Sequence, residues 1–266
     1  MLGRMPADAE IAVAMVAAGA EVVRRRFGAV LERIDKGGGD FATSADLEAE
    51  TAMLAVLRAH RPADAVMAEE SGEGGDDPSR TWLVDPLCGT LNYAARMPVV
   101  AVNAALRAGD RLVAAAVADP FGGDILWADE ASAHVRVDGC DSVLAPTAAT
   151  CLVDLNLDPP FPNAPAFSAV SLAADPEFVA GFRPRVVSSS VALAWVATGQ
   201  RAAYITDGDA RASVHFAAGI ALCEAAGCVV TDVFGERWGG GPTGLIAAAD
   251  SDTHAMLLRL AGKRRP

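Results

Sequence analysis

The residues best suited to chemistry lie where a short apolar run meets a tight turn, within residues 81–93. The apolar run 82–84 predicts a buried strand, Asp85-Pro86 predicts its end, and Gly89 permits a sharp turn before a helix. A carboxylate at the end of a strand, followed by free backbone N–H groups, suits a metal-bound phosphate. The segment therefore indicates phosphate chemistry that depends on a divalent cation.

Further residues that fit this chemistry lie before and well after that turn. Asp46 ends the stretch Phe-Ala-Thr-Ser-Ala-Asp at 41–46, and Glu69 begins Glu-Glu-Ser after a short apolar run. Near the other end of the chain, Ser-Val-His-Phe-Ala-Ala-Gly at 213–219 is followed by Glu-Ala-Ala-Gly at 224–227. Carboxylate oxygens of this kind are the ligands that Mg²⁺ prefers.

The segments at 81–93 and 213–227 resemble the two signatures of the inositol monophosphatase family. The usual forms are Asp-Pro-Leu/Ile-Asp-Gly-Thr-x-Asn-Phe, and Trp-Asp-x-Ala-Ala-Gly followed by Glu-Ala-Gly-Gly. The match runs from about Ala7 to Leu260. This resemblance implies a layered α/β fold, an α/β/α/β/α sandwich of the sugar-phosphatase type. It also implies a metal-dependent phosphomonoesterase that acts on a small phosphate ester.

The resemblance also implies roles for single residues. Ligands of a first metal, Mg²⁺, would be Glu69, Asp85 and the backbone carbonyl of Leu87. Glu69 and Thr90 would hold the attacking water, and Asp46 completes the catalytic set. The residues expected to contact the substrate are Gly89, Thr90, Ser188, Asp207 and Asp209. Asp207 and Asp209 are alternatives for one carboxylate, because the region before His215 is about two residues longer than in inositol phosphatases.

Two departures from the signatures fall on the second metal site. Cys88 and His215 stand where the family has aspartates that bind a second metal bridged by Asp85. Either that site is empty, or Asp85, Cys88 and His215 hold a softer metal such as Zn²⁺ or Mn²⁺. Taken alone, Cys88 could also be a small buried residue and His215 a hydrogen-bonded histidine.

The same departures support a second function from a different class. A catalytically silent family member could bind a phosphorylated metabolite or serve as a partner subunit. A nucleotide 3′-phosphatase or a fructose bisphosphatase is a weaker alternative, because the sequence shows no basic cluster for a second phosphate.

Composition narrows the cellular setting and the partners. With 52% hydrophobic residues among 266, the chain can bury a large core. No apolar run free of charges is long enough to span a membrane. The net charge of −12 argues against nucleic acid and anionic membranes as partners. Five cysteines follow no disulfide pattern. We expect a cytoplasmic protein, a homodimer by resemblance.

Periodicity and turn residues predict the elements that position these residues. Helices are expected at 7–27, 44–60, 188–198, 213–226 and 254–261. Strands are expected at 65–68, 82–84, 99–107, 112–119, 124–128, 133–137, 202–205, 229–233 and 245–248. Glycine-rich loops are expected at 36–40 and 72–79. The proline-rich stretch 146–165 is the predicted junction between an N-terminal half, residues 1–145, and a C-terminal half, residues 146–266.

Overall fold

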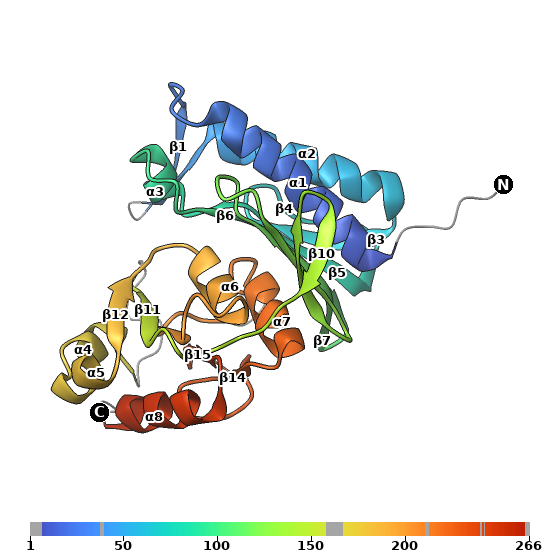
Figure 1. The fold of residues 1–266 in the computed structure, drawn as a ribbon. Coiled ribbons are helices and arrows are strands. Elements are labelled where there is room, and N and C mark those ends of the chain that lie inside the picture. Colours follow the sequence, from blue (N-terminus) through green and yellow to red (C-terminus); the bar gives the residue numbers. More distant parts are fainter. Residues whose placement is uncertain are drawn as a thin grey trace.

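The computed structural model describes residues 7–37, 40–157, 167–210, 213–239, 241 and 243–263. Its helices and strands form five layers, helix, sheet, helix, sheet, helix (Figure 1). The predicted α/β/α/β/α sandwich is therefore confirmed.

The first two layers come from residues before 144. An eight-stranded sheet has the order β10-β9-β8-β7-β6-β5-β3-β4, and a separate hairpin joins β1 to β2. Helices α1 (Asp8–Arg26) and α2 (Ser44–His60) cover the outer face of the eight-stranded sheet. The apolar sides of these helices form one core with that sheet. The strands are β1 (Arg33–Gly37), β2 (Asp40–Thr43), β3 (Asp64–Ala68), β4 (Gly72–Gly74), β5 (Asp77–Cys88), β6 (Ala101–Ala108), β7 (Arg111–Ala118), β8 (Ile125–Asp129), β9 (Ala133–Val137) and β10 (Cys140–Val143).

The middle layer consists of α6 (Val191–Ala197) and α7 (Ala217–Ala226). Both helices are rich in alanine and buried on almost every side, so each of their faces can meet a sheet. Their core includes Leu83 and Ala105 of the eight-stranded sheet as well as Tyr204 and Leu245 of the smaller one. This layer therefore joins the two sheets.

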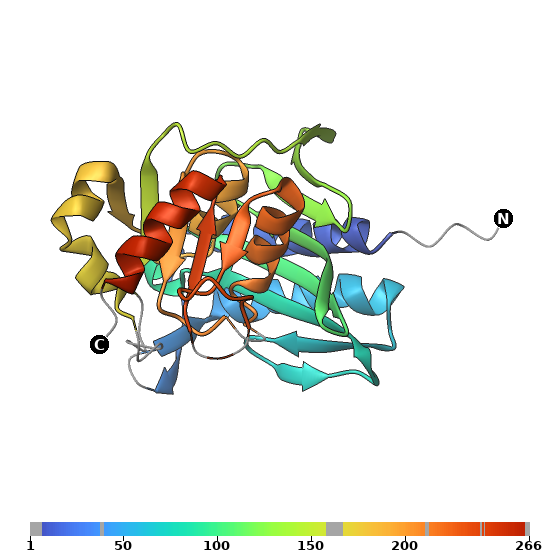
Figure 2. The ribbon, with the colours of Figure 1, turned by 90° about the horizontal axis from the view of Figure 1, so that it is seen from below.

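The smaller sheet contains five strands in the order β12-β11-β13-β15-β14. These are β11 (Leu152–Asn156), β12 (Arg183–Val186), β13 (Ala203–Thr206), β14 (Val229–Thr231) and β15 (Leu245–Ala248). Its outer face is covered by α4 (Ala169–Ala173), α5 (Pro176–Gly181) and α8 (Ser251–Gly262) (Figure 2). A short helix, α3 (Thr90–Ala94), follows β5.

Several boundaries differ from the predicted ones. Asp85-Pro86 does not end β5, which continues to Cys88 through an irregular register with β6. The predicted loop 72–79 contains β4 and the start of β5, and the predicted loop 36–40 lies in the β1–β2 hairpin, with residues 38–39 outside the described residues. Helix α7 starts at residue 217 instead of 213, and β10, β11 and β12 were not predicted.

The proline-rich stretch 146–165 only partly fits its predicted role as a junction. It contains β11, the centre of the smaller sheet's parallel pairs, while residues 158–166 lie outside the described residues. The two-half division at 145/146 stays a prediction. In the described part of the chain, no helix has the length and apolar character needed to cross a membrane.

Candidate active site

The turn between β5 and α3 places the first signature at the edge of the central layer. Gly89 has φ of 101°, a left-handed conformation that disfavours side chains. A Cβ there would lie 3.1 Å from the Val99 carbonyl oxygen and 3.2 Å from that of Ser188. Asn92 donates hydrogen bonds to the same two carbonyls, at 2.9 and 3.0 Å. Gly89 and Asn92 therefore hold the segment before α6 against this turn.

Asp85 and Glu69 lie side by side because their strands run in parallel. Ala68 of β3 pairs with Val84 of β5, so the next residue on each strand reaches the same edge of the sheet. The Glu69 N–H donates to the Val84 carbonyl at 3.0 Å, which continues the pairing. Two carboxylates therefore meet at one point, as the resemblance implied.

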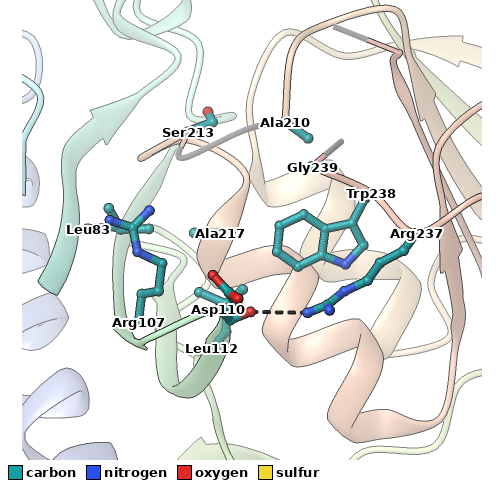
Figure 3. Close-up of a pocket in the computed structure, with 10 residues that line it drawn as sticks. All are labelled: Leu83, Arg107, Asp110, Leu112, Ala210, Ser213, Ala217, Arg237, Trp238 and Gly239. Atoms are coloured by element: carbon teal, nitrogen blue, oxygen red, sulfur yellow. Dashed lines mark hydrogen bonds between the residues drawn. The ribbon is translucent and has the colours of Figure 1, made fainter. Parts of the chain in front are cut away.

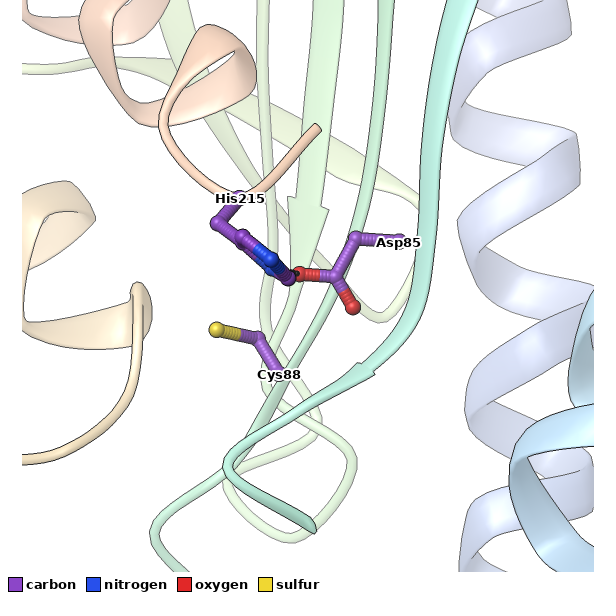
Figure 4. Close-up of side chains that lie close together, drawn as sticks. All are labelled: Asp85, Cys88 and His215. Atoms are coloured by element: carbon purple, nitrogen blue, oxygen red, sulfur yellow. Dashed lines mark hydrogen bonds and ion pairs between the residues drawn. The ribbon is translucent and has the colours of Figure 1, made fainter. Parts of the chain in front are cut away.

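The Asp85 side chain is fully buried and makes three polar contacts. Oδ1 accepts a hydrogen bond from the Leu87 N–H at 3.1 Å, and Oδ2 accepts one from Asn103 Nδ2 at 3.3 Å. His215 Nδ1 lies 2.8 Å from Oδ2 (Figure 4). A contact between residues 130 positions apart thus joins the two signatures.

Asp85 and His215 form an ion pair whose members shift each other's pKa. Burial opposes ionisation of Asp85, but the His215 charge and the hydrogen bonds to the carboxylate together outweigh it and lower the pKa of Asp85. Burial alone would lower the pKa of His215, yet the Asp85 carboxylate raises this pKa well above its ordinary value. The imidazolium–carboxylate form is therefore favoured.

Cys88 completes a group of three possible metal ligands. One ligand atom each from Asp85, Cys88 and His215 lies within 4.8 Å of the other two (Figure 4). The Cys88 sulfur accepts a hydrogen bond from the Ser190 N–H at 3.1 Å. Burial raises the pKa of the Cys88 thiol, and the Asp85 charge adds to this effect. The three side chains therefore lie close enough together to contact one metal ion, which would have to displace the protons of the thiol and the imidazolium.

Glu69 is held by a lysine from the β1–β2 hairpin. Lys36 Nζ lies 3.1 Å from Glu69 Oε1 and 2.7 Å from Glu70 Oε1. The other oxygen, Glu69 Oε2, is buried and has no hydrogen-bond partner among the described residues. Burial, followed by the charge of Asp85, raises the pKa of Glu69 to about 9. A protonated Glu69 is therefore favoured at neutral pH.

Thr90 and Asp46 form a second polar group beside these carboxylates. The Thr90 hydroxyl lies 3.0 Å from Asp46 Oδ1 and 3.2 Å from the Leu87 carbonyl oxygen. Asp46 Oδ2 accepts hydrogen bonds from the Thr43 N–H at 2.8 Å and the Thr43 hydroxyl at 2.6 Å. The same contacts cap α2, since Thr43 precedes its first residue. Helix α2 therefore fixes the orientation of the Thr90 hydroxyl.

The sequence matches a model of the inositol monophosphatase family over residues 7–265. The inositol-1-monophosphatase of Caulobacter vibrioides is 32% identical over 242 residues, covering 88% of this chain and 93% of the relative. This chain belongs to the inositol monophosphatase family. The Nus factor SuhB of Escherichia coli is 37% identical over 99 residues, 37% of each chain. The extragenic suppressor protein SuhB of Bartonella henselae superposes with a TM-score of 0.85 at 25% identity, covering 96% of this chain and 98% of that one.

Among inositol monophosphatase signatures, this chain departs at Cys88 and His215, while Glu69, Asp85 and Thr90 match them. Ser188 lies next to the Gly89 turn, where its carbonyl accepts from Asn92. Asp207 is buried, and its Oδ2 accepts a hydrogen bond from the Ala169 N–H at the start of α4, at 3.2 Å. Asp209 is partly buried in the loop after β13. The roles of these three residues toward a substrate stay predictions.

Three residues of this site were not singled out from the sequence. Lys36 contacts Glu69, Asn103 contacts Asp85, and Ser190 contacts both Cys88 and Asn103, whose Nδ2 lies 2.8 Å from Ser190 Oγ. Asn103 carried a signal that could have been read, because it is the one polar residue in the apolar run 99–106. Lys36 and Ser190 carried none, since a lysine and a serine near glycines or helix starts are common.

Proposed function

We propose that this protein is a metal-dependent phosphomonoesterase that hydrolyses a small phosphate ester. The observation that carries the proposal is the meeting of Glu69, Asp85 and the Thr90–Asp46 pair at the end of β5, in a chain of this family. Glu69, Asp85 and the Leu87 carbonyl supply hard oxygen atoms, and the hydroxyl of Thr90 has a fixed orientation. Such a site can hold a water molecule in line with a phosphorus atom.

Glu69 and Thr90 would orient the attacking water. The Thr90 hydroxyl donates to Asp46, so its oxygen lone pairs remain available to accept a hydrogen bond from the water. Glu69 would take the second water proton as general base. The N–H groups of Gly89 and Thr90 would bind phosphate oxygens, because the turn leaves them at the start of α3.

Glu69, Asp85 and the Leu87 carbonyl suit Mg²⁺, because all three ligands are hard oxygens. The buried Glu69 Oε2, which has no partner among the described residues, supports a cation at this position. When bound, Mg²⁺ would offset the negative charge that the phosphoryl group develops in the transition state. Lys36 would have to leave Glu69 Oε1 if the metal used that oxygen.

The residues of the second site do not fit Mg²⁺, which prefers oxygen and dehydrates reluctantly. Zn²⁺ accepts a carboxylate, a thiolate and an imidazole, with bonds of about 2.0–2.3 Å. Asp85, Cys88 and His215, with ligand atoms within 4.8 Å of one another, offer that set. The Ser190 N–H bonded to the Cys88 sulfur would stabilise the thiolate. We therefore infer a softer second site for Zn²⁺ or Mn²⁺.

One observation favours the alternative, a catalytically silent family member that binds a phosphorylated metabolite or acts as a partner subunit. His215 pairs with Asp85 and Lys36 pairs with Glu69, so both metal-binding carboxylates already have a cationic partner from the chain. Such pairs can stabilise the fold without a metal.

Hydrolysis of p-nitrophenyl phosphate with Mg²⁺, Mn²⁺ or Zn²⁺ separates the two functions. We expect metal-dependent turnover that falls roughly 10²–10⁴-fold in Glu69→Gln, the range for loss of a general base. Glu73→Gln, which changes an exposed acid on neighbouring β4, should retain full turnover. Phosphate binding with no turnover above the Glu69→Gln level would establish the silent alternative.

The setting of the proposed enzyme follows from composition and resemblance. The net charge of −12 makes a small metabolite a better partner than nucleic acid. We also propose a cytoplasmic homodimer, which the apparent mass in solution would test. Elution as a monomer at micromolar concentration would remove the dimer from the proposal.

A further inference from the structure

A cavity of about 370 Å³ adjoins the candidate active site (Figure 3). Leu83 lines it and lies two residues before Asp85 on β5, so both side chains face the same side of the sheet. Ser213 and Ala217, which flank His215 in the chain, line it as well. The cavity therefore has lining residues two positions from Asp85 along β5 and two positions from His215 along the chain.

Two arginines from distant parts of the chain line this cavity. Arg107 belongs to β6, and Arg237 belongs to the loop between β14 and β15. Arg237 donates to the Asp110 carbonyl at 3.0 Å. Arg107 is half-buried, and no acceptor among the described residues bonds to it. A partly desolvated guanidinium in this state favours an anionic partner.

Among the described residues that line this cavity, the net charge is positive. The charged ones are two arginines, Arg107 and Arg237, and one carboxylate, Asp110, a net charge of +1. The chain as a whole carries −12. A local field of opposite sign within a concave surface concentrates anions there.

Trp238 supplies a flat apolar wall opposite Arg107 (Figure 3). Its Nε1 donates to Glu224 Oε1 of α7 at 2.7 Å, which fixes the indole plane. A fixed indole can contact a ring in face-to-face or edge-to-face geometry without ordering a mobile side chain. The cavity therefore combines one surface for a ring with one for an anion.

We propose that this cavity is the subsite that selects the substrate: a phosphate ester whose remainder carries a flat ring and a second anionic group. Arg107 would bind that second anion, and Trp238 would contact the ring. This proposal rests on the proposed phosphatase function, whose phosphate site it extends. The sequence showed no basic cluster because the two arginines are 237 − 107 = 130 positions apart.

The test compares phenyl phosphate with 4-carboxyphenyl phosphate, which adds one carboxylate to the same ring. The selectivity is the ratio of the two kcat/KM values. We expect the protein to prefer the carboxylated ester, and Arg107→Gln to reduce this selectivity about tenfold, as for one charged hydrogen bond. Arg107→Lys, which keeps the charge, should retain part of it. Arg111→Gln is the matched control, because Arg111 pairs with Glu130 and does not line the cavity.

Binding of the corresponding phosphonates, measured by calorimetry, separates failure of this subsite from failure of the proposed function. If the protein binds the carboxylated phosphonate more tightly, this preference depends on Arg107, and neither ester is turned over, the proposed subsite is supported and the proposed phosphatase activity is rejected. Turnover with the same selectivity in the unchanged protein, Arg107→Gln and Arg111→Gln would overturn the subsite. Equal binding of both phosphonates would overturn it as well.

Discussion

At the scale of single residues, the proposed metal chemistry of this protein depends on Cys88 and His215. Both side chains lie beside Asp85, and one possible ligand atom from each of the three residues lies within 4.8 Å of the other two. A thiol and an imidazole replace two formal negative charges there. The affinity of the site for Mg²⁺ should therefore be low, while its affinity for a softer metal is kept.

The double variant Cys88→Asp with His215→Asp should raise Mg²⁺-dependent turnover of p-nitrophenyl phosphate at least about tenfold, the effect of a gain of roughly 1.4 kcal/mol. It restores the oxygen ligands that Mg²⁺ prefers. Zn²⁺ titration should release protons from the unchanged protein and protect Cys88 from alkylation, but not release them from the double variant. Unchanged Mg²⁺ turnover, or Cys88 that stays reactive with Zn²⁺ present, would contradict the softer site.

Gly89 provides a second prediction at this scale. Gly89→Ala should destabilise the protein by at least about 1 kcal/mol more than Gly109→Ala, because only at Gly89 does the new methyl crowd two carbonyls and overpacking costs about 1–3 kcal/mol. Gly109 also has positive φ, but open space surrounds it. Urea unfolding of both variants measures the difference. Equal losses would mean that the segment before α6 moves away from the turn without cost.

At the scale of elements, the sequence predicted those with a strong local pattern. Helices α1 and α2 and the hairpin β6–β7 were found because each repeats its apolar residues with a clear period. The edge strands β10 and β12 were missed, since most of their residues are exposed and show no alternation. Strand β5 continues past Pro86 because the irregular pairing with β6 leaves no hydrogen bond for Pro86 to donate.

The candidate site, like the elements, could be predicted only where the sequence carries a local pattern. Motif residues such as Glu69, Asp85 and Thr90 could be named because their types and order carry the resemblance. Partners such as Lys36 and Ser190 could not, because their positions depend on how distant elements pack. The Lys36–Glu69 contact crosses 33 positions and the Ser190–Cys88 contact crosses 102.

Asp154 of strand β11 forms a pH-sensitive pair with Arg201, whose Nε lies 2.7 Å from Asp154 Oδ2. Burial outweighs the Arg201 charge and raises the pKa of Asp154 to about 6. Its pKa is therefore higher in the folded chain than in the unfolded one, where the ordinary value is about 3.9. The contribution of Asp154 to the free energy of unfolding is fully present below about pH 4. It is lost as the pH rises to about 6, and the loss is at most about 3 kcal/mol.

Asp154→Asn should remove this loss. The free energy of unfolding of the variant, relative to the unchanged protein, should therefore rise between pH 4.5 and pH 7 in urea titrations. Asp76→Asn, at an exposed position, is the control and should show no such rise. A relative stability of Asp154→Asn that falls or stays level across this range would show that Arg201 dominates.

At the scale of the whole molecule, the middle helices α6 and α7 make one core from both sheets. A chain cut at residue 145 would leave Leu83, Ala101 and Ala105 of the larger sheet uncovered on that face. We expect residues 1–145 alone to bind a hydrophobic dye and to unfold without a sharp transition. The full chain should unfold in one step, with circular dichroism and tryptophan fluorescence coinciding. Cooperative unfolding of the fragment would instead establish it as an independent domain.

The 130-residue separation of Asp85 and His215 has a consequence for synthesis of the protein. A ribosome adds roughly 5–20 residues per second, so residue 215 is made about 6–25 s after residue 88. Until residue 190 is made, the nascent chain has the Cys88 thiol without the Ser190 N–H, and until residue 215 is made it also lacks the imidazole. Oxidants and stray thiophilic ions can reach Cys88 then more easily than in the finished fold. During translation, the thiol-reducing systems of the cell must therefore keep Cys88 reduced. After folding, the contacts around Cys88 protect it.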